Sequence, residues 1–311
     1  MPRMKKTILV IGASGFLGRH VAKALLVDGR TVRCMARNLS NVQDLSDAGC
    51  EVVQGDILDI ASVERALESA QAVYISIHTL STQAANSSSH DFMGVEMTGL
   101  QNIVRACETH GVRRLVYVTS IGVAQNAPSA WLRGRWQTEQ FLLGSKLDVT
   151  VLRPGMIVGR GGTGFNAVLS GAKRPFAILL GSGQQRMRTI AVEDLAYYLV
   201  GVLDDPRSFG NPYEVGSDDV LSMDQMIDEA ADFLGRSHPV KIHVPQALLA
   251  LFAPLLERAT KLPRGAFKGL VDSLSVNMEG NPAPIRTLLA RPLQSYRQSV
   301  KRVLGGSAAP K

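Results

Sequence analysis

The stretch Thr7–Arg19, TILVIGASGFLGR, has the pattern of a buried strand, a glycine turn and the first turn of a helix. The run from Ile8 to Ile11 is apolar without interruption and too short for a helix. Three glycines at a spacing of three follow it, and an apolar-periodic segment over residues 16–27 comes next. This order predicts a strand–turn–helix unit whose turn binds the pyrophosphate of a dinucleotide.

Each glycine of the turn has a predicted task. Gly12 lets the chain turn sharply out of the strand, Gly15 removes a side chain where the backbone approaches phosphate, and Gly18 lets helix and strand pack closely. The first amides of the helix and the positive end of its dipole then face the anion. The alternative is a glycine-rich turn that binds nothing. The predicted pyrophosphate contacts are Gly12, Ser14, Gly15, Phe16, Leu17 and Gly18.

The composition is typical of a globular protein. The 311 residues are 45% hydrophobic and 20% charged, enough for one large domain or a domain with a smaller lobe. Cys34, Cys50 and Cys107 have neither metal-ligand spacing nor an even framework, so we expect reduced thiols and no metal site. No apolar segment is long enough to span a membrane, and we therefore expect a cytoplasmic protein.

The positive charge is concentrated near the end of the chain. Residues 1–240 contain 23 Lys and Arg against 24 Asp and Glu, whereas residues 241–311 contain 11 against 3. Such a basic segment can contact membrane headgroups, nucleic acid or an acidic partner, or it can be a solvated surface. We expect no nucleic-acid partner, and peripheral contact with the inner membrane or with a membrane complex remains a hypothesis.

Strands and helices alternate through the first half of the chain, which predicts a parallel sheet with helical crossovers. Right-handed crossovers give a doubly wound α/β sheet of the Rossmann type, whose ligand lies at the carboxyl ends of the strands. We expect strands at residues 8–11, 31–36, 51–54, 72–77, 114–119 and 148–152, and helices at 16–27, 60–69, 95–110 and 129–143.

The end of the second strand selects the cofactor. In dinucleotide folds a carboxylate there takes the ribose 2′-hydroxyl of NAD, whereas an arginine accommodates the 2′-phosphate of NADP. Arg37 follows this strand, and no Asp or Glu occurs between Thr31 and Gln43. We therefore predict NADP(H), with NAD(H) as the alternative if Arg37 is only a solvated loop charge.

Two further strand ends supply candidate cofactor contacts. Asp56 and Ile57 follow the third strand, where the adenine is expected. Ile77 and His78 follow the fourth strand, beside the adjoining ribose, although His78 could equally be a loop histidine with a structural partner.

Several motifs together resemble one family. GASGFLG after the first strand, GDILD after the third, LVYVTSIGV at the fifth, VTVLRPGMIVG at the sixth and RTIAVEDLA further on resemble the extended and atypical short-chain dehydrogenase/reductases. They are most similar to the branch of NAD(P)H-binding NmrA-like and complex I NDUFA9-like proteins, over about residues 5 to 235. The resemblance implies cofactor binding. It implies catalysis less strongly, because the branch contains reductases, redox-sensing regulators and non-catalytic accessory subunits.

The chain departs from the family pattern in the helix after the fifth strand. Typical members have Tyr-x-x-x-Lys there, the tyrosine being the acid or base and the lysine lowering its pKa and holding the ribose. Counting back from Glu139, which matches a glutamate usual after that lysine, Trp131 and Arg135 occupy these positions. Tryptophan only donates through its indole N–H, whereas arginine stays charged and could still hold a ribose hydroxyl.

Thr119 and Ser120, at the end of the fifth strand, are the hydroxyls that remain. A serine without a partner base is a weak acid but an adequate hydrogen-bond donor, and it could equally just satisfy the strand end. The catalytic candidates are therefore Ser120, Trp131 and Arg135. Thr119, Arg135 and Pro154 complete the cofactor candidates, because Pro154 resembles the family loop that passes the nicotinamide.

Beyond Gly235 the prolines at 239, 245, 254, 263, 282, 284 and 292 predict short pieces rather than a long continuous helix. We predict an NAD(P)-binding domain over residues 1–235, with lobe insertions after about 155, and a smaller, interleaved basic lobe over 236–311. The apolar run from Ala247 to Leu256 has two interpretations. It contacts an anionic membrane or a membrane-bound partner, or its side chains Leu248, Leu251, Phe252 and Leu255 form the core of the lobe.

The sequence favours an NADP(H)-dependent reductase that transfers hydride to a small conjugated or apolar acceptor bound between Ser120, Trp131 and the lobe. The alternative is a non-catalytic NAD(P)H-binding regulator, or an accessory protein of a respiratory complex or a quinone pathway. Sugar epimerisation ranks third, because it too normally needs the missing tyrosine.

Overall fold

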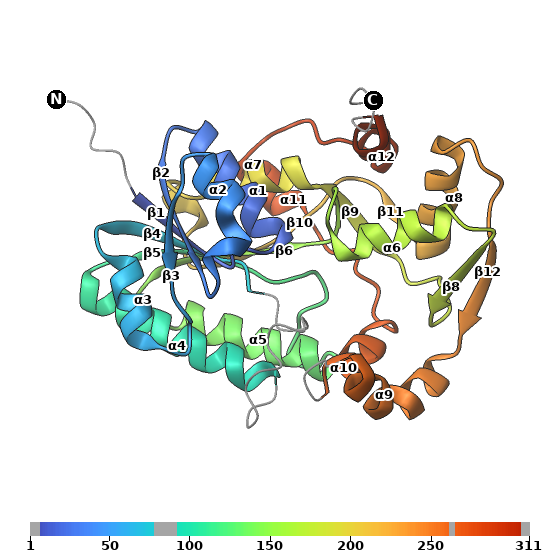
Figure 1. Ribbon diagram of the computed structural model, residues 1–311, viewed down its shortest axis with the longest axis horizontal. Helices are drawn as coiled ribbons and strands as arrows, with labels where there is room; N and C mark the ends of the chain where they lie inside the picture. The colour runs from blue at the N-terminus through green and yellow to red at the C-terminus, as the bar shows by residue number, and fades with distance from the viewer. Residues whose placement is uncertain (1–6, 78–91, 261–264, 306–311) are drawn as a thin grey trace. The chain divides into compact units, whose positions relative to one another are not determined.

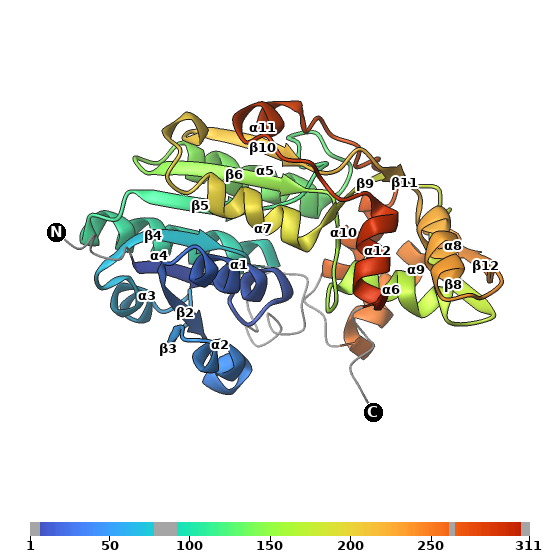
Figure 2. The same ribbon diagram turned by 90° about the horizontal axis from the view of Figure 1, so that it is seen from above.

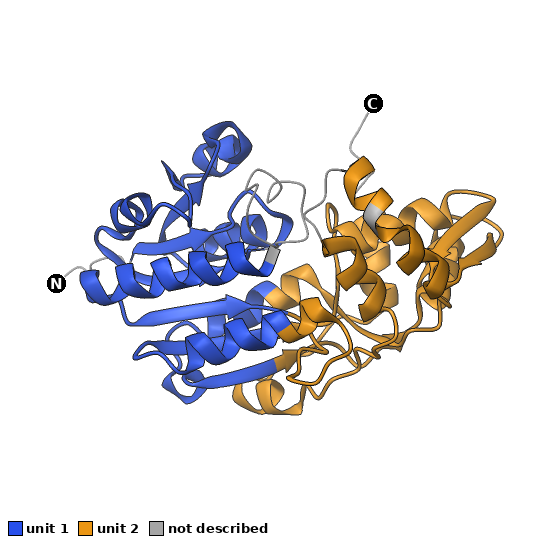
Figure 3. Cartoon of the chain, turned by 90° about the horizontal axis from the view of Figure 1, so that it is seen from below, with its two compact units in different colours: residues 1–119, 134–152, 196–213 blue, residues 120–133, 153–195, 214–311 orange. Residues whose placement is uncertain are grey.

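The computed structural model describes residues 7–77, 92–260 and 265–305, and the chain divides into two compact units (Figure 3). Unit 1 consists of residues 1–119, 134–152 and 196–213, and unit 2 consists of residues 120–133, 153–195 and 214–311. Each unit is therefore assembled from separate segments of the chain. The division into residues 1–235 and 236–311 stays a prediction.

Unit 1 is built around a seven-stranded sheet in the order β10-β6-β5-β4-β1-β2-β3 (Figure 1). Strands β1 to β6 pair in parallel, which confirms the doubly wound α/β fold. The order reverses between β1 and β4, the position at which open α/β sheets bind their ligands. The strands are β1 (Thr7–Ile11), β2 (Thr31–Ala36), β3 (Glu51–Gln54), β4 (Ala70–Ile75), β5 (Arg114–Val118), β6 (Asp148–Pro154) and β10 (Asn211–Val215).

Helices cover both faces of this sheet, so its central strands are largely apolar (Figure 2). One face packs against α3, α4 and α5 through side chains such as Leu67, Ile103 and Leu142. On the other face, α1 buries Val21 and Leu25. The helices are α1 (Phe16–Val27), η1 (Leu39–Val42), α2 (Gln43–Asp47), α3 (Ile60–Leu67), α4 (Phe92–His110), α5 (Ala130–Leu143), α7 (Val192–Gly201) and η3 (Pro206–Ser208).

Unit 2 contains two small sheets with helices packed on them. A three-stranded sheet has the order β11-β9-β7, and β12 pairs with β8 in parallel. Phe165, Met226 and Tyr296 are central to the core of this unit. Its elements are β7 (Met156–Val158), α6 (Thr163–Ala172), β8 (Phe176–Leu180), β9 (Met187–Ala191), β11 (Val220–Leu221), α8 (Met223–Phe233), β12 (Val240–Val244), α9 (Gln246–Thr260), α10 (Ala266–Ser273), α11 (Ala283–Leu288) and α12 (Tyr296–Gly305).

The six strands and four helices predicted for unit 1 are present, with ends that shift by a few residues. The structure also contains strands that the sequence did not indicate, namely β7, β8, β10, β11 and β12. They are short or carry an exposed face, so their apolar pattern is weaker than that of a fully buried strand.

The prediction of short pieces beyond Gly235 is wrong for α9, which continues through Pro254. A proline inside a helix removes one backbone hydrogen bond and costs about 3 kcal/mol, so tertiary contacts must offset that cost. Leu249 and Ala253 are buried on one side of α9. The Glu257 carboxylate accepts hydrogen bonds from the amides of Gly265, Phe267 and Lys268, at 2.9, 2.9 and 3.1 Å. These contacts tie the end of α9 to the start of α10.

The four side chains proposed as the core of the lobe are not buried. Leu248, Leu251, Phe252 and Leu255 are 45%, 72%, 47% and 65% exposed, so this interpretation of the apolar run is wrong. Within the part of the chain that the structure describes, none of the helices combines the length and apolar character that a bilayer crossing needs.

The turn after β1 fits tightly against the end of β4. Gly12 has a φ of +88°, and a Cβ atom placed on it would lie 2.2 Å from the Ser76 carbonyl oxygen. A Cβ atom on Gly18 would lie 2.2 Å from the Gly12 carbonyl oxygen, so helix α1 packs directly against the turn. The sharp turn predicted at Gly12 and the close packing predicted at Gly18 are therefore present.

We expect Gly12→Ala to destabilise the protein more than Gly29→Ala, its matched control. Gly29 has a similar φ of +79° but nothing within 4 Å of an added Cβ atom. The control should cost about 1–2 kcal/mol for left-handed backbone, and Gly12→Ala should exceed it by a further 1–3 kcal/mol or so for the clash. Urea denaturation of the three proteins gives both values. Equal losses would mean that the turn does not need the close approach.

Candidate cofactor site

The glycine turn is shaped to receive an anion at the start of α1. The Gly15 amide donates to the Gly12 carbonyl oxygen at 3.0 Å, which closes the turn. Helix α1 begins at Phe16 after Gly15, and no side chain caps its first amides. Helix N-termini with uncapped amides bind phosphate through those N–H groups and the helix dipole. The cradle therefore fits the pyrophosphate of a dinucleotide.

The remaining predicted residues of the turn are placed differently from one another. Ser14 and Phe16 are half-buried, whereas Leu17 is buried with 8% of its surface exposed. The Phe16 ring meets the His20 ring edge-on at 4.8 Å between centroids. Leu17 can therefore offer an anion its backbone amide rather than its side chain.

Arg37 follows β2 directly and is exposed. Its carbonyl oxygen accepts a hydrogen bond from Gln54 Nε2 at 3.1 Å, which fixes the backbone beside the end of β3. Arg33, also on β2, instead pairs with Glu51 at 2.8 Å between Nε and Oε2. Arg37 is the residue that the 2′-phosphate prediction concerns, and it lies exposed directly after β2.

Asp56 and Ile57 shape the connection from β3 to α3. One Asp56 carboxylate oxygen accepts from the Leu58 amide at 3.0 Å, which makes a local turn. The Ile57 carbonyl oxygen accepts from Asn102 Nδ2 at 2.8 Å, and its side chain packs so closely on Gly99 that a Cβ there would lie 2.4 Å from Cδ1. The carbonyl group and the side chain of Ile57 therefore both contact α4.

Arg135 is the centre of a buried polar network. Its guanidinium donates to the Ile77 carbonyl oxygen at 3.2 Å, to Glu96 Oε1 at 2.7 Å and to the Val118 carbonyl oxygen at 2.9 Å. The side chains of Arg135 and Glu96 are 4% and 0% exposed. Burial alone would lower the pKa of Arg135, but the Glu96 carboxylate raises it, so the guanidinium stays charged.

Tyr117 completes this network. Burial raises the pKa of Tyr117 well above its usual value, so its hydroxyl keeps its proton and donates to Glu96. The hydroxyl also lies 3.0 Å from Thr138 Oγ1. Glu96 was not predicted, and its one signal in the sequence is a carboxylate among the mostly apolar residues that begin α4.

His78, which was predicted to lie beside the ribose, is outside the described residues.

Thr119 and Ser120 follow β5 but their hydroxyls differ. The Thr119 hydroxyl donates to Glu139, and both side chains are buried. Ser120 Oγ is also buried, yet it has no hydrogen-bond partner among the described residues. A buried hydroxyl without a partner is costly unless a ligand or water satisfies it. Ser120 is therefore the better hydrogen-bond donor for a bound molecule.

Trp131 and Pro154 both belong to unit 2. Trp131 is 8% exposed and lies in the first turn of α5, one turn before Arg135. Pro154 ends β6, and its carbonyl oxygen accepts from the Ile121 amide at 3.0 Å. This bond fixes the segment that follows Ser120.

The other candidate chemistry in the described part of the chain is sparse. No group of three or more His, Cys, Asp or Glu residues there could hold a metal ion. Cys34, Cys50 and Cys107 are buried free thiols, and burial raises the pKa of Cys107 to about 12. A thiol with that pKa is not a nucleophile at neutral pH.

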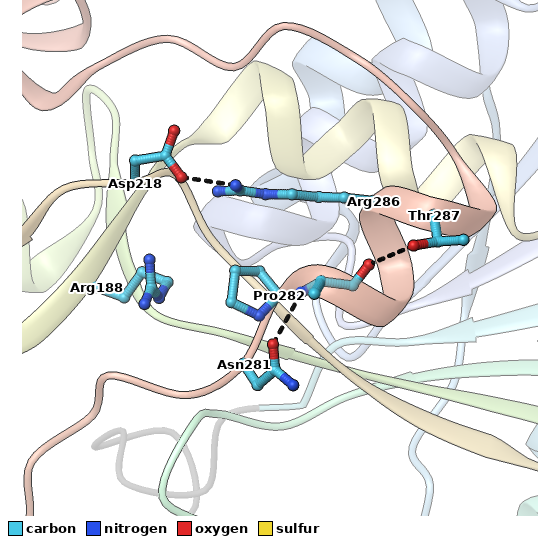
Figure 4. Close-up of a pocket in the computed structure, with 7 residues that line it drawn as sticks. Arg188, Asp218, Asn281, Pro282, Arg286 and Thr287 are labelled. Carbon is cyan, nitrogen blue, oxygen red and sulfur yellow. Dashed lines mark hydrogen bonds and ion pairs between the residues drawn. The ribbon is translucent and has the colours of Figure 1, made fainter.

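A pocket of about 460 Å³ in unit 2 contains two arginines (Figure 4). Arg286 donates to Asp218 Oδ1 at 2.6 Å and to the Gly216 carbonyl oxygen at 2.7 Å. Arg188 donates to the Ser217 carbonyl oxygen at 2.7 Å. Both guanidinium groups therefore hold the loop from Gly216 to Asp218, which gives them a structural role.

Comparison with known proteins supports a dinucleotide site. A family model described as NAD(P)H-binding matches residues 12–206. The chain is 29% identical over 173 residues to sterol demethylase protein B of Methylococcus capsulatus, covering 49% of this chain and 52% of that protein. It is 26% identical over 262 residues to the mitochondrial NADH dehydrogenase [ubiquinone] 1 alpha subcomplex subunit 9 of Arabidopsis thaliana, covering 82% and 64%. The matches thus span about half to two thirds of these relatives. The predicted resemblance to complex I subunits of this type is confirmed.

A solved structure supports the fold. The NADPH-dependent quinone oxidoreductase of Escherichia coli superimposes with a TM-score of 0.73 at 19% identity, covering 96% of this chain and 99% of that one. At this identity the similarity concerns the arrangement of the backbone alone.

The buried pair predicts a large loss of stability when one partner is removed. We expect Arg135→Met to cost about 3–5 kcal/mol, because Glu96 would remain buried without its cation. The double variant Arg135→Met, Glu96→Leu should recover part of that loss. Arg113→Met, which removes the pair between exposed Arg113 and Asp148, is the control and should leave the denaturation midpoint nearly unchanged. If Arg135→Met lowered the free energy of unfolding only slightly, the structural role of the pair would be contradicted.

Proposed function

The chain belongs to the NAD(P)H-binding family, and from this premise we propose that it is an NADP(H)-dependent reductase of small conjugated or apolar acceptors. The nicotinamide of the bound cofactor would supply the hydride. The observation that carries the proposal is the pair of residues in the helix after β5. Trp131 stands where the resemblance expects a proton donor, and Arg135 is engaged by Glu96 and two backbone carbonyls.

The choice of acceptor follows from what the remaining residues can do. A hydride added to a simple ketone produces an alkoxide, which needs a proton donor or a preorganised oxyanion contact. A conjugated enone or quinone spreads the developing charge over several atoms and can take its proton from water. Ser120 Oγ, buried and without a partner among the described residues, can donate one hydrogen bond to such an acceptor.

The proposed preference for NADP(H) rests on Arg37. It is exposed beside the end of β2, where the ribose 2′-position lies in dinucleotide folds, and no carboxylate occurs between Thr31 and Gln43. An arginine there attracts a 2′-phosphate through charge-assisted hydrogen bonds.

We expect NADPH to bind more tightly than NADH, and Arg37→Ala to remove most of the difference, about 1–3 kcal/mol. Arg65→Ala removes an exposed charge from α3 and should leave the preference intact. Fluorescence titration of each protein with both cofactors gives the affinities. Equal affinities in the unmodified protein, or an unchanged preference in Arg37→Ala, would refute the assignment.

A second candidate function is an accessory or regulatory protein that binds NAD(P)H without turning it over. The use of Arg135 as a structural cation is compatible with a site that no longer performs chemistry. The relative that is a subunit of NADH dehydrogenase supports this candidate as well. The two functions differ in one measurable property, which is consumption of the bound cofactor.

We expect NADPH consumption with enones or quinones and negligible consumption with simple ketones or sugars. Ser120→Ala should slow the reaction with conjugated acceptors by about tenfold, because it removes one hydrogen bond to the developing charge. Trp131→Tyr should not create ketone reductase activity, since the residue four positions later is Arg135. Brisk reduction of a simple ketone would overturn the proposal. If NADPH binds tightly but is not consumed with any acceptor, the accessory function would be favoured.

A further inference from the structure

We propose that unit 2 docks on the surface of an anionic phospholipid bilayer through the exposed apolar sides of α9 and of the β8–β12 ladder. This proposal does not rest on the reductase function. It specifies a surface that the sequence could only suggest as a basic, apolar segment.

The exposed large hydrophobic side chains are unevenly distributed over the described residues. Unit 1 has three that lie far apart in the sequence, namely Val27, Leu39 and Leu58. Single exposed residues of this kind are normal, whereas a cluster indicates a binding surface. Unit 2 has a cluster in four neighbouring elements, consisting of Phe176, Ile178, Leu180, Val240, Ile242, Leu248, Leu251, Phe252, Leu255 and Leu270.

The outer side of α9 is an apolar stripe. Leu248, Leu251, Phe252 and Leu255 are spaced at i, i+3, i+4 and i+7, so they lie on one side of the helix. Their exposed fractions are 45%, 72%, 47% and 65%. The helix packs on the core of unit 2 through its other side, where Leu249 is 7% exposed. The stripe is therefore available for a partner.

The β8–β12 ladder has a second apolar surface. Phe176 pairs with Val240 and Ile178 with Ile242, and these four side chains are 57%, 61%, 73% and 48% exposed. The alternate residues of β8, Ala177 and Leu179, are buried in the core of the unit. A sheet face in water is normally polar, and this one carries only aliphatic and aromatic side chains on its paired positions.

The two surfaces lie on elements that are adjacent in the chain. Strand β12 ends at Val244, and α9 begins two residues later at Gln246. At the end of β8, the Gly181 amide donates to the Val244 carbonyl oxygen at 2.9 Å. The chain thus passes directly from the end of the ladder into α9, a connection that can be followed in the ribbon (Figure 1).

Charge selects the anionic bilayer as the partner. Residues 241–270 contain five basic residues and one acidic residue, Glu257. Of the five, Lys241 pairs with Asp228 at 2.6 Å, and Lys261 and Arg264 lie outside the described residues. Glu257 is 7% exposed and accepts three backbone amides, so its negative charge faces inward. Arg258 is exposed at the end of the stripe, and the Lys268 side chain is 61% exposed although it pairs with Asp272. An apolar stripe bordered by cations is typical of helices that lie in the headgroup region of anionic membranes.

The test is flotation of the full chain with vesicles of phosphatidylcholine alone or mixed with phosphatidylglycerol, at low and high salt. We expect binding to the mixed vesicles at low salt, and weaker binding at high salt or without the anionic lipid. Leu251→Ser and Ile178→Ser should each weaken binding by about tenfold. The double variant Arg258→Gln, Lys268→Gln should weaken it by about fivefold and reduce its dependence on salt.

Val27→Ser is the matched control, because Val27 is 91% exposed but lies in unit 1. It should bind vesicles as the unmodified protein does, and circular dichroism should show all variants folded. Absence of flotation with the mixed vesicles at low salt would overturn the proposal. Equal binding of Leu251→Ser and the unmodified protein would overturn it too. A dimer that Leu251→Ser dissociates, with no vesicle binding, would assign the surface to a second copy instead.

Discussion

A positive charge buried in unit 1 has to be neutralised, and Glu96 does this for Arg135. The pair joins α4 to α5, and the same guanidinium holds the carbonyl oxygens at Ile77 and Val118, which follow or end two adjacent strands. The ends of β4 and β5, where a dinucleotide fold places its ligand, are therefore fixed by one side chain. Arg135 therefore has a structural role in the interior of the protein, whether or not it also contributes to chemistry. If Trp131 and Arg135 take the places of the tyrosine and lysine, as the sequence predicts, that replacement changes the core as well as the site.

The fold of unit 1 could be predicted because its signals are local. The run Ile8 to Ile11, the glycines after it and the alternation of apolar segments each depend on a few neighbouring residues. The tight turn at Gly12 and Gly18 followed from the same spacing. Glu96 could not be predicted, because its partners Tyr117 and Arg135 lie some 20 and 40 positions along the chain. A carboxylate with distant partners resembles a solvated one in sequence.

The errors in unit 2 have a common physical cause. Pro254 costs a helix one hydrogen bond wherever it occurs, but whether the helix continues depends on contacts such as those of Glu257 with the start of α10. Likewise, an apolar stripe in the sequence predicts which side of a helix is apolar. It does not predict whether the protein core or a partner covers that side. Leu249, rather than Leu251 or Leu255, faces the interior of unit 2. The difference is one of rotation about the helix axis, which tertiary packing decides.

The interleaving of the two units has a consequence for synthesis of the chain. Helix α5 contributes residues 130–133 to unit 2 and the rest to unit 1, and the last strand of the large sheet, β10, begins only at Asn211. During translation, the nucleotide-binding sheet therefore lacks its edge strand until most of the polypeptide has left the ribosome, and residues of unit 2 emerge before unit 1 is complete. Neither unit can be produced as one uninterrupted fragment. All residues of unit 1 have been synthesised once Tyr213 is added, whereas unit 2 still needs the residues from 214 onward.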